Sequence, residues 1–115
     1  MYIDRITSMA TETTLSKLDA DLMNTEGRRI KLSSLRGKYV LVSFWSTTSE
    51  TCLEELAVLK SLYKTYHGKG LEIYHVNLDV DEARWKSVVK FEEIPWISVR
   101  EDDPLNPQFA GSLNI

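Results

Sequence analysis

The sequence contains a single cysteine, Cys52, and no long apolar segment. One cysteine cannot form a disulfide within the chain, so cysteine usage does not identify a redox compartment. The longest uninterrupted apolar runs are a few residues, well short of the roughly 20 that span a bilayer. We therefore expect no membrane span in this chain.

An excess of charge of one sign is also missing. Fourteen Lys and Arg residues stand against 17 Asp and Glu residues, which gives a formal net charge of −3. The sequence has no block of like charge and no basic stripe interleaved with aromatic residues, so nucleic acid is not an expected partner. With 115 residues, 43% of them hydrophobic and 27% charged, the composition indicates one soluble globular domain.

The N-terminus lacks the basic start and the continuous apolar core of a signal peptide. Either the protein is cytoplasmic, with the chain complete as given, or a leader was removed. We interpret residues 1–18, which are rich in Thr and Ser, as an N-terminal extension. Residues 19–115 are then the folded domain.

Two strands joined by a helix form the centre of the predicted domain. Residues 39–45 are apolar on both faces up to Ser43, as in a buried central strand. Apolar residues then recur at steps of three and four from Cys52 to Tyr66, which predicts an amphipathic helix. Residues 71–80 predict a second strand, parallel to the first because a helix connects the two.

The flanking segments predict smaller elements. Residues 21–32 have the pattern of a β-hairpin closed by a turn glycine. A short extended segment is predicted at 96–99 and a last helical turn at 108–113. Asp81 can cap a helix over 82–92, whose inner face is predicted to consist of Trp85, Val88, Val89 and Phe91.

Several short motifs occur together in this order along the chain. They are Leu32-Ser33-Ser34-Leu35-Arg36-Gly37-Lys38, Phe44-Trp45-Ser46, Cys52-x-x-Glu55-Leu56, Val76-Asn77-Leu78-Asp79, Trp85-Lys86 and Ile94-Pro95-Trp96. In this combination, over roughly residues 20–115, the chain resembles the TlpA/ResA branch of thioredoxin-like thiol-disulfide oxidoreductases.

The resemblance implies an α/β thioredoxin-like fold with three α/β/α layers and a central mixed sheet. Family members continue past the position of Ile115 into a strand opened by a cis-proline, a partner strand and a closing helix. The resemblance therefore also implies that this chain is truncated before the cis-proline strand. It suggests a protein partner or a thiol substrate, and a periplasmic location if a leader was removed.

The reactive Cys-x-x-Cys motif of the family falls on Ser49-Glu50-Thr51-Cys52, with Trp45 and Glu55 as its surroundings. Ser49 occupies the place of the attacking cysteine. Dithiol exchange requires a low-pKa thiolate to attack and a second thiol to resolve the mixed disulfide. A serine hydroxyl titrates far above a thiol and forms no disulfide. We therefore expect a degenerate redox site that serves in binding or scaffolding.

Two roles are open for Ser49 and for Cys52. Ser49 is most simply a helix-cap residue, although Thr47 and Glu50 also have capping-box spacing. Cys52 shares the apolar stripe of Leu56, so we expect a shielded thiol that packs like a small apolar residue. A reactive monothiol, favoured by the helix N-terminus, is the alternative.

Peroxide reduction is a second alternative. Peroxiredoxins share the fold and carry Thr or Ser three residues before their cysteine, as Ser49 precedes Cys52. They also carry a proline where this chain has Trp45, and an arginine from a later strand that neither Arg84 nor Arg100 matches in position. The sequence shows no ligand pair at metal-binding spacing and no phosphate loop, so we expect no metal and no cofactor.

The expected truncation has a consequence for assembly. In the family, the strands that follow the cis-proline pair with the strand at 39–45. Without them, that strand is expected to be an open, apolar sheet edge, and such edges associate. We therefore predict a homo-oligomer, formed by pairing at this edge or by exchange of residues 1–18.

Overall fold

The computed structural model describes residues 2–5 and 20–112. Six strands form one sheet in the order β1-β4-β5-β6-β2-β3. The strands are β1 (Tyr2–Arg5), β2 (Asp21–Asn24), β3 (Arg29–Lys31), β4 (Tyr39–Trp45), β5 (Leu71–Asn77) and β6 (Ile97–Arg100). The helices are α2 (Glu50–Tyr66), α3 (Glu82–Phe91) and α4 (Gln108–Ser112), with 3-10 turns η1 (Leu32–Leu35) and η2 (His67–Lys69).

The sheet is mixed, as the sequence predicts. β4, β5 and β6 are parallel, with Leu41 opposite Ile73 and Tyr74 opposite Ile97. β2 pairs antiparallel with both β3 and β6, so the predicted hairpin is confirmed. β5 ends at Asn77, three residues before the predicted end of that strand.

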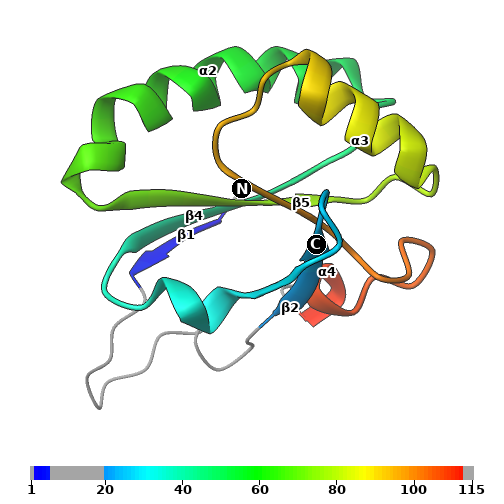
Figure 1. The fold of residues 1–115 in the computed structure, drawn as a ribbon, viewed down its shortest axis with the longest axis horizontal. Helices are drawn as coiled ribbons and strands as arrows, with labels where there is room; N and C mark the ends of the chain where they lie inside the picture. The colour runs from blue at the N-terminus through cyan, green and yellow to red at the C-terminus, as the bar shows by residue number, and fades with distance from the viewer. Residues whose placement is uncertain (1, 6–19, 113–115) are drawn as a thin grey trace.

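Two layers of helix cover the sheet (Figure 1). α2 and α3 lie on one face, and η1 and α4 lie on the other. The core under α2 and α3 consists of Leu41, Trp45, Leu56, Leu59, Ile73, Trp85 and Trp96. The core on the opposite face consists of Ala20, Leu22, Leu32, Leu35, Val40, Val42, Tyr74, Val76, Val99 and Phe109. The predicted three-layer α/β/α arrangement is confirmed.

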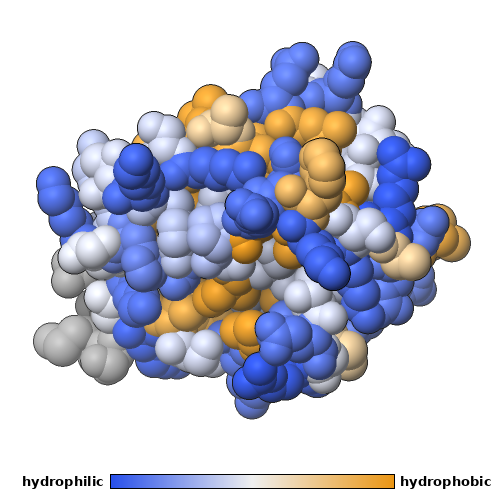
Figure 2. All heavy atoms as spheres, turned by 45° about the horizontal axis from the view of Figure 1, so that its top comes forward, coloured by the Kyte–Doolittle hydropathy of each residue, from blue (hydrophilic) through white to orange (hydrophobic). Residues whose placement is uncertain are grey.

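The outer side of the two long helices is mixed in polarity. Figure 2 is turned so that these helices come forward, and it shows apolar patches separated by hydrophilic residues. The most exposed large apolar residues of α2 and α3 are Val58, at 59% exposure, and Phe91, at 85%.

Phe91 departs from its predicted place on the inner face of α3. Trp85 is 1% exposed on that face, whereas Phe91 is almost fully exposed. Six residues of α-helix turn the side-chain direction by roughly 600°, so Phe91 points about 120° away from Trp85. Ile94, beyond the end of the helix, packs against the core in place of Phe91.

β4 is also not the open edge that the sequence suggests. β1 pairs antiparallel with β4, from Tyr2 opposite Val42 to Arg5 opposite Tyr39. The expectation of an unpaired strand over 39–45 is therefore wrong for the first four residues of β4. The predicted homo-oligomer loses most of its physical basis and stays a prediction. The rest of the N-terminal extension, residues 1 and 6–18, lies outside the described residues.

Across the described parts of the chain, no helix has both the length and the apolar character needed to cross a bilayer.

Removal of residues 1–5 tests whether β1 protects the edge of β4. The shortened chain exposes backbone N–H and C=O groups over Tyr39–Val42, and unpaired groups beside apolar side chains promote association. We expect the shortened chain to self-associate at lower concentration than the full chain, as measured by light scattering across a dilution series. Identical scattering of the two chains at every concentration would show that β1 has no protective role.

Candidate functional site

The motif loop, residues 46–49, connects the end of β4 to the start of α2 and is held by one buried carboxylate. Asp79, 5% exposed, accepts hydrogen bonds from the Thr47 amide N–H at 3.0 Å and from Ser46 Oγ at 2.7 Å. Parallel strands end at the same edge of a sheet, so the residues after β5 lie beside the loop after β4. Asp79 thereby fixes the path of the chain into α2.

The environment of Asp79 favours its charged form. Asn77 Nδ2 donates to the Asp79 carboxylate at 3.0 Å, and the Asp79 N–H donates back to Asn77 Oδ1 at 2.8 Å. Burial alone raises the pKa of Asp79, but the hydrogen bonds from Ser46, Asn77 and Thr47 together outweigh it and hold the pKa below its ordinary value. The network therefore holds a carboxylate, not a carboxylic acid, at neutral pH.

Two arginines extend this network. Arg84 Nε donates to Thr47 Oγ1 at 2.9 Å. Arg100 Nε donates to the Asp79 carbonyl oxygen at 2.8 Å, and Arg100 Nη2 donates to the Val80 carbonyl oxygen at 2.9 Å. These contacts tie α3 to the motif loop, and β6 to the segment after β5 that carries Asp79.

A cleft of about 370 Å³ opens beside the motif loop. It combines hydroxyl groups, two carboxylates and one guanidinium, which suits polar contacts with a partner or substrate. Its lining residues are Ser46, Thr48, Leu78, Asp79, Val80, Asp81 and Arg84.

Ser49 is the N-cap residue of α2. Its Oγ accepts a hydrogen bond from the Cys52 amide N–H at 3.3 Å, and its backbone is extended, as is usual at this position. The structure places the cap at Ser49, so the capping-box spacing that starts at Thr47 is not used. Thr47 is instead buried against Asp79.

Cys52 is less shielded than the sequence suggests. It is a free cysteine of intermediate burial that packs against the core beneath α2. Leu56 and Leu59, on the same stripe, are 2% and 1% exposed. Cys52 lies in the first turn of the helix, and the core covers only part of its side chain.

The other predicted motif residues differ in how deeply they are buried. Glu50 and Thr51 are exposed in the first turn of α2, and Glu55 is half-buried one turn later. Trp45 is buried at the end of β4 and stacks on His75, with ring centroids 4.8 Å apart. Among these residues, a side chain-to-backbone hydrogen bond joins Ser49 to Cys52.

His75 does not supply a base at this site. It is 1% exposed, and burial lowers the pKa of its imidazole to about 3, so the ring is neutral. Within residues 2–5 and 20–112, no three His, Cys, Asp or Glu side chains come together as a metal site would require.

Sequence reasoning named Asp79 only as the end of the motif Val76-Asn77-Leu78-Asp79 and predicted no contact of Ser46 or Thr47 with it. A signal was present, because Asp79 follows one parallel strand and Ser46 follows its neighbour. Their proximity depends on both strands being parallel and adjacent, which the crossover helix already predicts.

Substitution of Asp79 tests the network. Asp79→Asn directs an amide N–H₂ toward groups that are themselves donors, so we expect the free energy of unfolding to fall by about 2–3 kcal/mol. Because the folded pKa lies below the unfolded one, this stabilisation is complete above the ordinary Asp pKa. It is lost as the pH falls through the folded pKa. Denaturant titrations at neutral and acid pH measure both effects.

The control is Asp81→Asn, at the exposed cap of α3. Asn caps helices about as well as Asp, so we expect a much smaller change in the free energy of unfolding. Equal effects of the two substitutions would contradict a special role for Asp79.

Comparisons with known proteins agree with this geometry. A family model described as the AhpC/TSA family matches residues 8–99. The thiol-disulfide oxidoreductase ResA of Geobacillus thermodenitrificans is 34% identical over 100 residues, which cover 83% of this chain and 56% of that protein. ResA of Bacillus subtilis is 42% identical over 57 residues, 50% of this chain and 32% of that protein. The chain thus spans about half or less of the length of these relatives.

Solved structures share the fold. The thioredoxin domain of a thiol-disulfide oxidoreductase from Bacteroides vulgatus is 28% identical, with a TM-score of 0.78 over 84% of this chain and 69% of that one. A thiol-disulfide oxidoreductase from Bacteroides fragilis is 27% identical, with a TM-score of 0.76 over 84% of this chain and 73% of that one. The chain therefore belongs to the AhpC/TSA family and is a thioredoxin-like, thiol-disulfide oxidoreductase-like domain of the TlpA/ResA type.

Proposed function

We propose that this domain binds a protein partner or a thiol-containing ligand at the motif end of the sheet and does not catalyse dithiol exchange. The observation that carries the proposal is the role of Ser49, whose hydroxyl caps α2 by accepting the Cys52 N–H at 3.3 Å. The position from which a cysteine attacks in the family is thus occupied by a group that stabilises the helix and has no redox chemistry.

The rest of the motif end supports binding. The loop 46–49 is fixed by Asp79, so a partner meets a preorganised surface. The adjoining cleft of about 370 Å³ offers hydroxyl, carboxylate and guanidinium groups. A fold commonly persists when its usual chemistry is lost, because the scaffold and the reacting groups are separate.

A monothiol function of Cys52 is the alternative. Cys52 is partly accessible and lies in the first turn of α2, where the positive end of the helix dipole favours a thiolate. Arg84, bound to Thr47 in the motif loop, adds a positive charge to that end of the molecule. A peroxiredoxin-like or glutathione-type reaction would use this thiol alone, with an external thiol to resolve the oxidised sulfur.

A turnover assay separates these functions. We expect no reduction of insulin disulfides by dithiothreitol above the uncatalysed rate. Ser49→Cys restores two thiols at family spacing, and we expect this variant to form an internal disulfide and to gain reductase activity. Thr48→Cys is the matched control, because it adds a thiol in the same loop at the wrong spacing. Catalysis by the unmodified chain that Cys52→Ala abolishes would contradict the proposal.

Thiol labelling tests the accessibility of Cys52. Because the core covers part of its side chain, we expect a chromogenic thiol reagent to react several-fold more slowly with the folded than with the denatured chain. The control is Leu53→Cys in a Cys52→Ser background, which moves the thiol to an exposed neighbouring position. We expect this control to react at nearly the denatured rate. Fast native labelling of Cys52, with sulfenic acid formation in dilute peroxide, would favour the peroxidatic alternative.

A further inference from the structure

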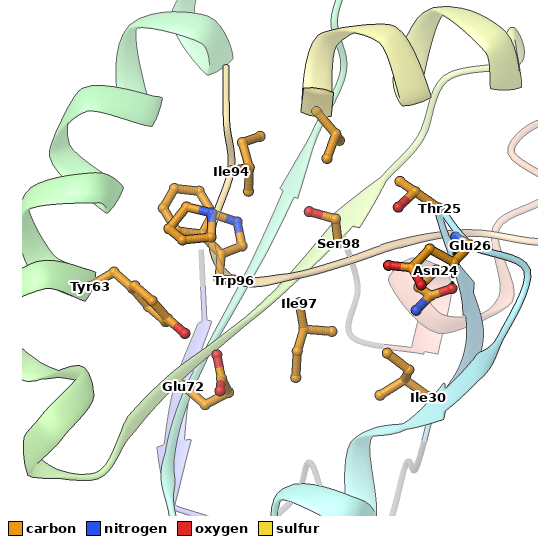
Figure 3. Close-up of a pocket in the computed structure, with 12 residues that line it drawn as sticks. Asn24, Thr25, Glu26, Ile30, Tyr63, Glu72, Ile94, Trp96, Ile97 and Ser98 are labelled. Carbon is orange, nitrogen blue, oxygen red and sulfur yellow. Dashed lines mark hydrogen bonds between the residues drawn. The ribbon is translucent and has the colours of Figure 1, made fainter. Parts of the chain in front are cut away.

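A second cavity, of about 320 Å³, lies at the end of the sheet opposite the motif loop. It is bounded by the starts of β5 and β6, the last turns of α2 and the turn between β2 and β3 (Figure 3). Its lining residues are Asn24, Thr25, Glu26, Ile30, Tyr63, Glu72, Val89, Ile94, Pro95, Trp96, Ile97 and Ser98. None of the residues that line the motif cleft lines this cavity.

The cavity is acidic. Glu72 is 7% exposed, and its ion-pair partner among the described residues is a histidine, His67. Its Oε1 accepts the Ile73 N–H at 2.9 Å, and its Oε2 lies 3.8 Å from His67 Nε2, which is charged only when protonated. Figure 3 shows the Tyr63 hydroxyl beside the Glu72 carboxylate, and burial together with this carboxylate raises the pKa of Tyr63.

No lysine or arginine offsets this charge within the lining. Glu26 is the other acidic lining residue, and it pairs with Arg28 at 2.7 Å outside the cavity. Glu72 is therefore the buried charge that a ligand would meet, and a buried carboxylate is stabilised by a paired cation.

Two polar groups at the cavity wall have no hydrogen-bond partner among the described residues. They are Ser98 Oγ, on a side chain that is 6% exposed, and Trp96 Nε1, on a side chain that is 5% exposed. Figure 3 shows the Ser98 hydroxyl pointing into the cavity. Buried polar groups are satisfied in nearly all folded proteins, and each one left without a partner costs stability. These groups mark where polar atoms of a ligand would lie.

We propose that this cavity binds an organic cation, a primary ammonium or guanidinium group, through Glu72. The cation pairs with the Glu72 carboxylate, the Tyr63 hydroxyl adds a polar contact, and the apolar walls of Ile94 and Ile97 contact the attached carbon chain. Ser98 and Trp96 hold a polar atom of the ligand or a water molecule that accompanies it. The site is independent of the motif loop and of the function proposed for it.

Two kinds of ligand carry such a cation: a free small amine, and a peptide with a basic side chain. Titrations with butylammonium and with N-acetyl-lysine amide distinguish them, because the second probe carries the backbone groups of a peptide. Similar affinity for both probes indicates a free amine, and clearly tighter binding of the amide indicates a peptide. Acetate serves as the anionic control.

The indole N–H resonance of Trp96, assigned by its loss in Trp96→Phe, reports on binding in ¹H–¹⁵N spectra. We expect butylammonium to shift this resonance saturably and acetate to leave it unchanged. Glu72→Gln preserves the shape of the side chain and removes its charge, so we expect roughly tenfold weaker binding. Glu54→Gln, on the exposed side of α2, is the matched control and should bind as the unmodified chain does.

Two results would overturn the proposal: a Trp96 resonance that shows no saturable shift with butylammonium, or equal affinities of the unmodified chain and Glu72→Gln. If Glu72→Gln does not fold, Tyr63→Phe decides, because it removes the hydroxyl group beside the Glu72 carboxylate. We expect this variant to bind the cation several-fold more weakly, and an unchanged affinity would count against the site.

Discussion

The carboxylate of Asp79 is the interaction on which the motif end of this domain depends. A loop that leaves a buried strand and enters a helix within four residues carries several backbone N–H groups that the sheet no longer satisfies. Asp79 accepts one of them from Thr47 and also binds the Ser46 hydroxyl. Its own position is fixed by Asn77, the last residue of β5. The start of α2 is thereby placed relative to the sheet before any chemistry is considered.

This arrangement is compatible with the binding function proposed for the domain. The cap of α2 needs an oxygen acceptor at Ser49, and serine provides it at least as well as cysteine would. The loop is held by Asp79 through backbone and hydroxyl groups, none of which belongs to a cysteine. Serine at position 49 thus keeps the cap of α2 and leaves the contacts of the loop with Asp79 in place.

Local and nearest-neighbour features were predictable from the sequence. The parallel pair β4–β5, the hairpin β2–β3 and the cap at Asp81 follow from periodicity, turn residues and capping chemistry, which act over a few residues. The pairing of β1 with β4 was not predictable in this way, because a four-residue strand carries little pattern and its partner lies far along the chain. The same applies to the acidic cavity, whose lining comes from four separate segments. The partial exposure of Cys52, in the first turn of α2, is also not determined by periodicity alone.

Titration of the Asp79 carboxyl carbon by NMR tests the central role of this residue most directly. We expect the midpoint to lie below the ordinary pKa of aspartate. The Thr47 amide resonance should shift at the same midpoint, because its N–H donates to that carboxylate. A midpoint at or above the ordinary value, with a Thr47 amide that does not respond, would show that the motif loop is held by something other than Asp79.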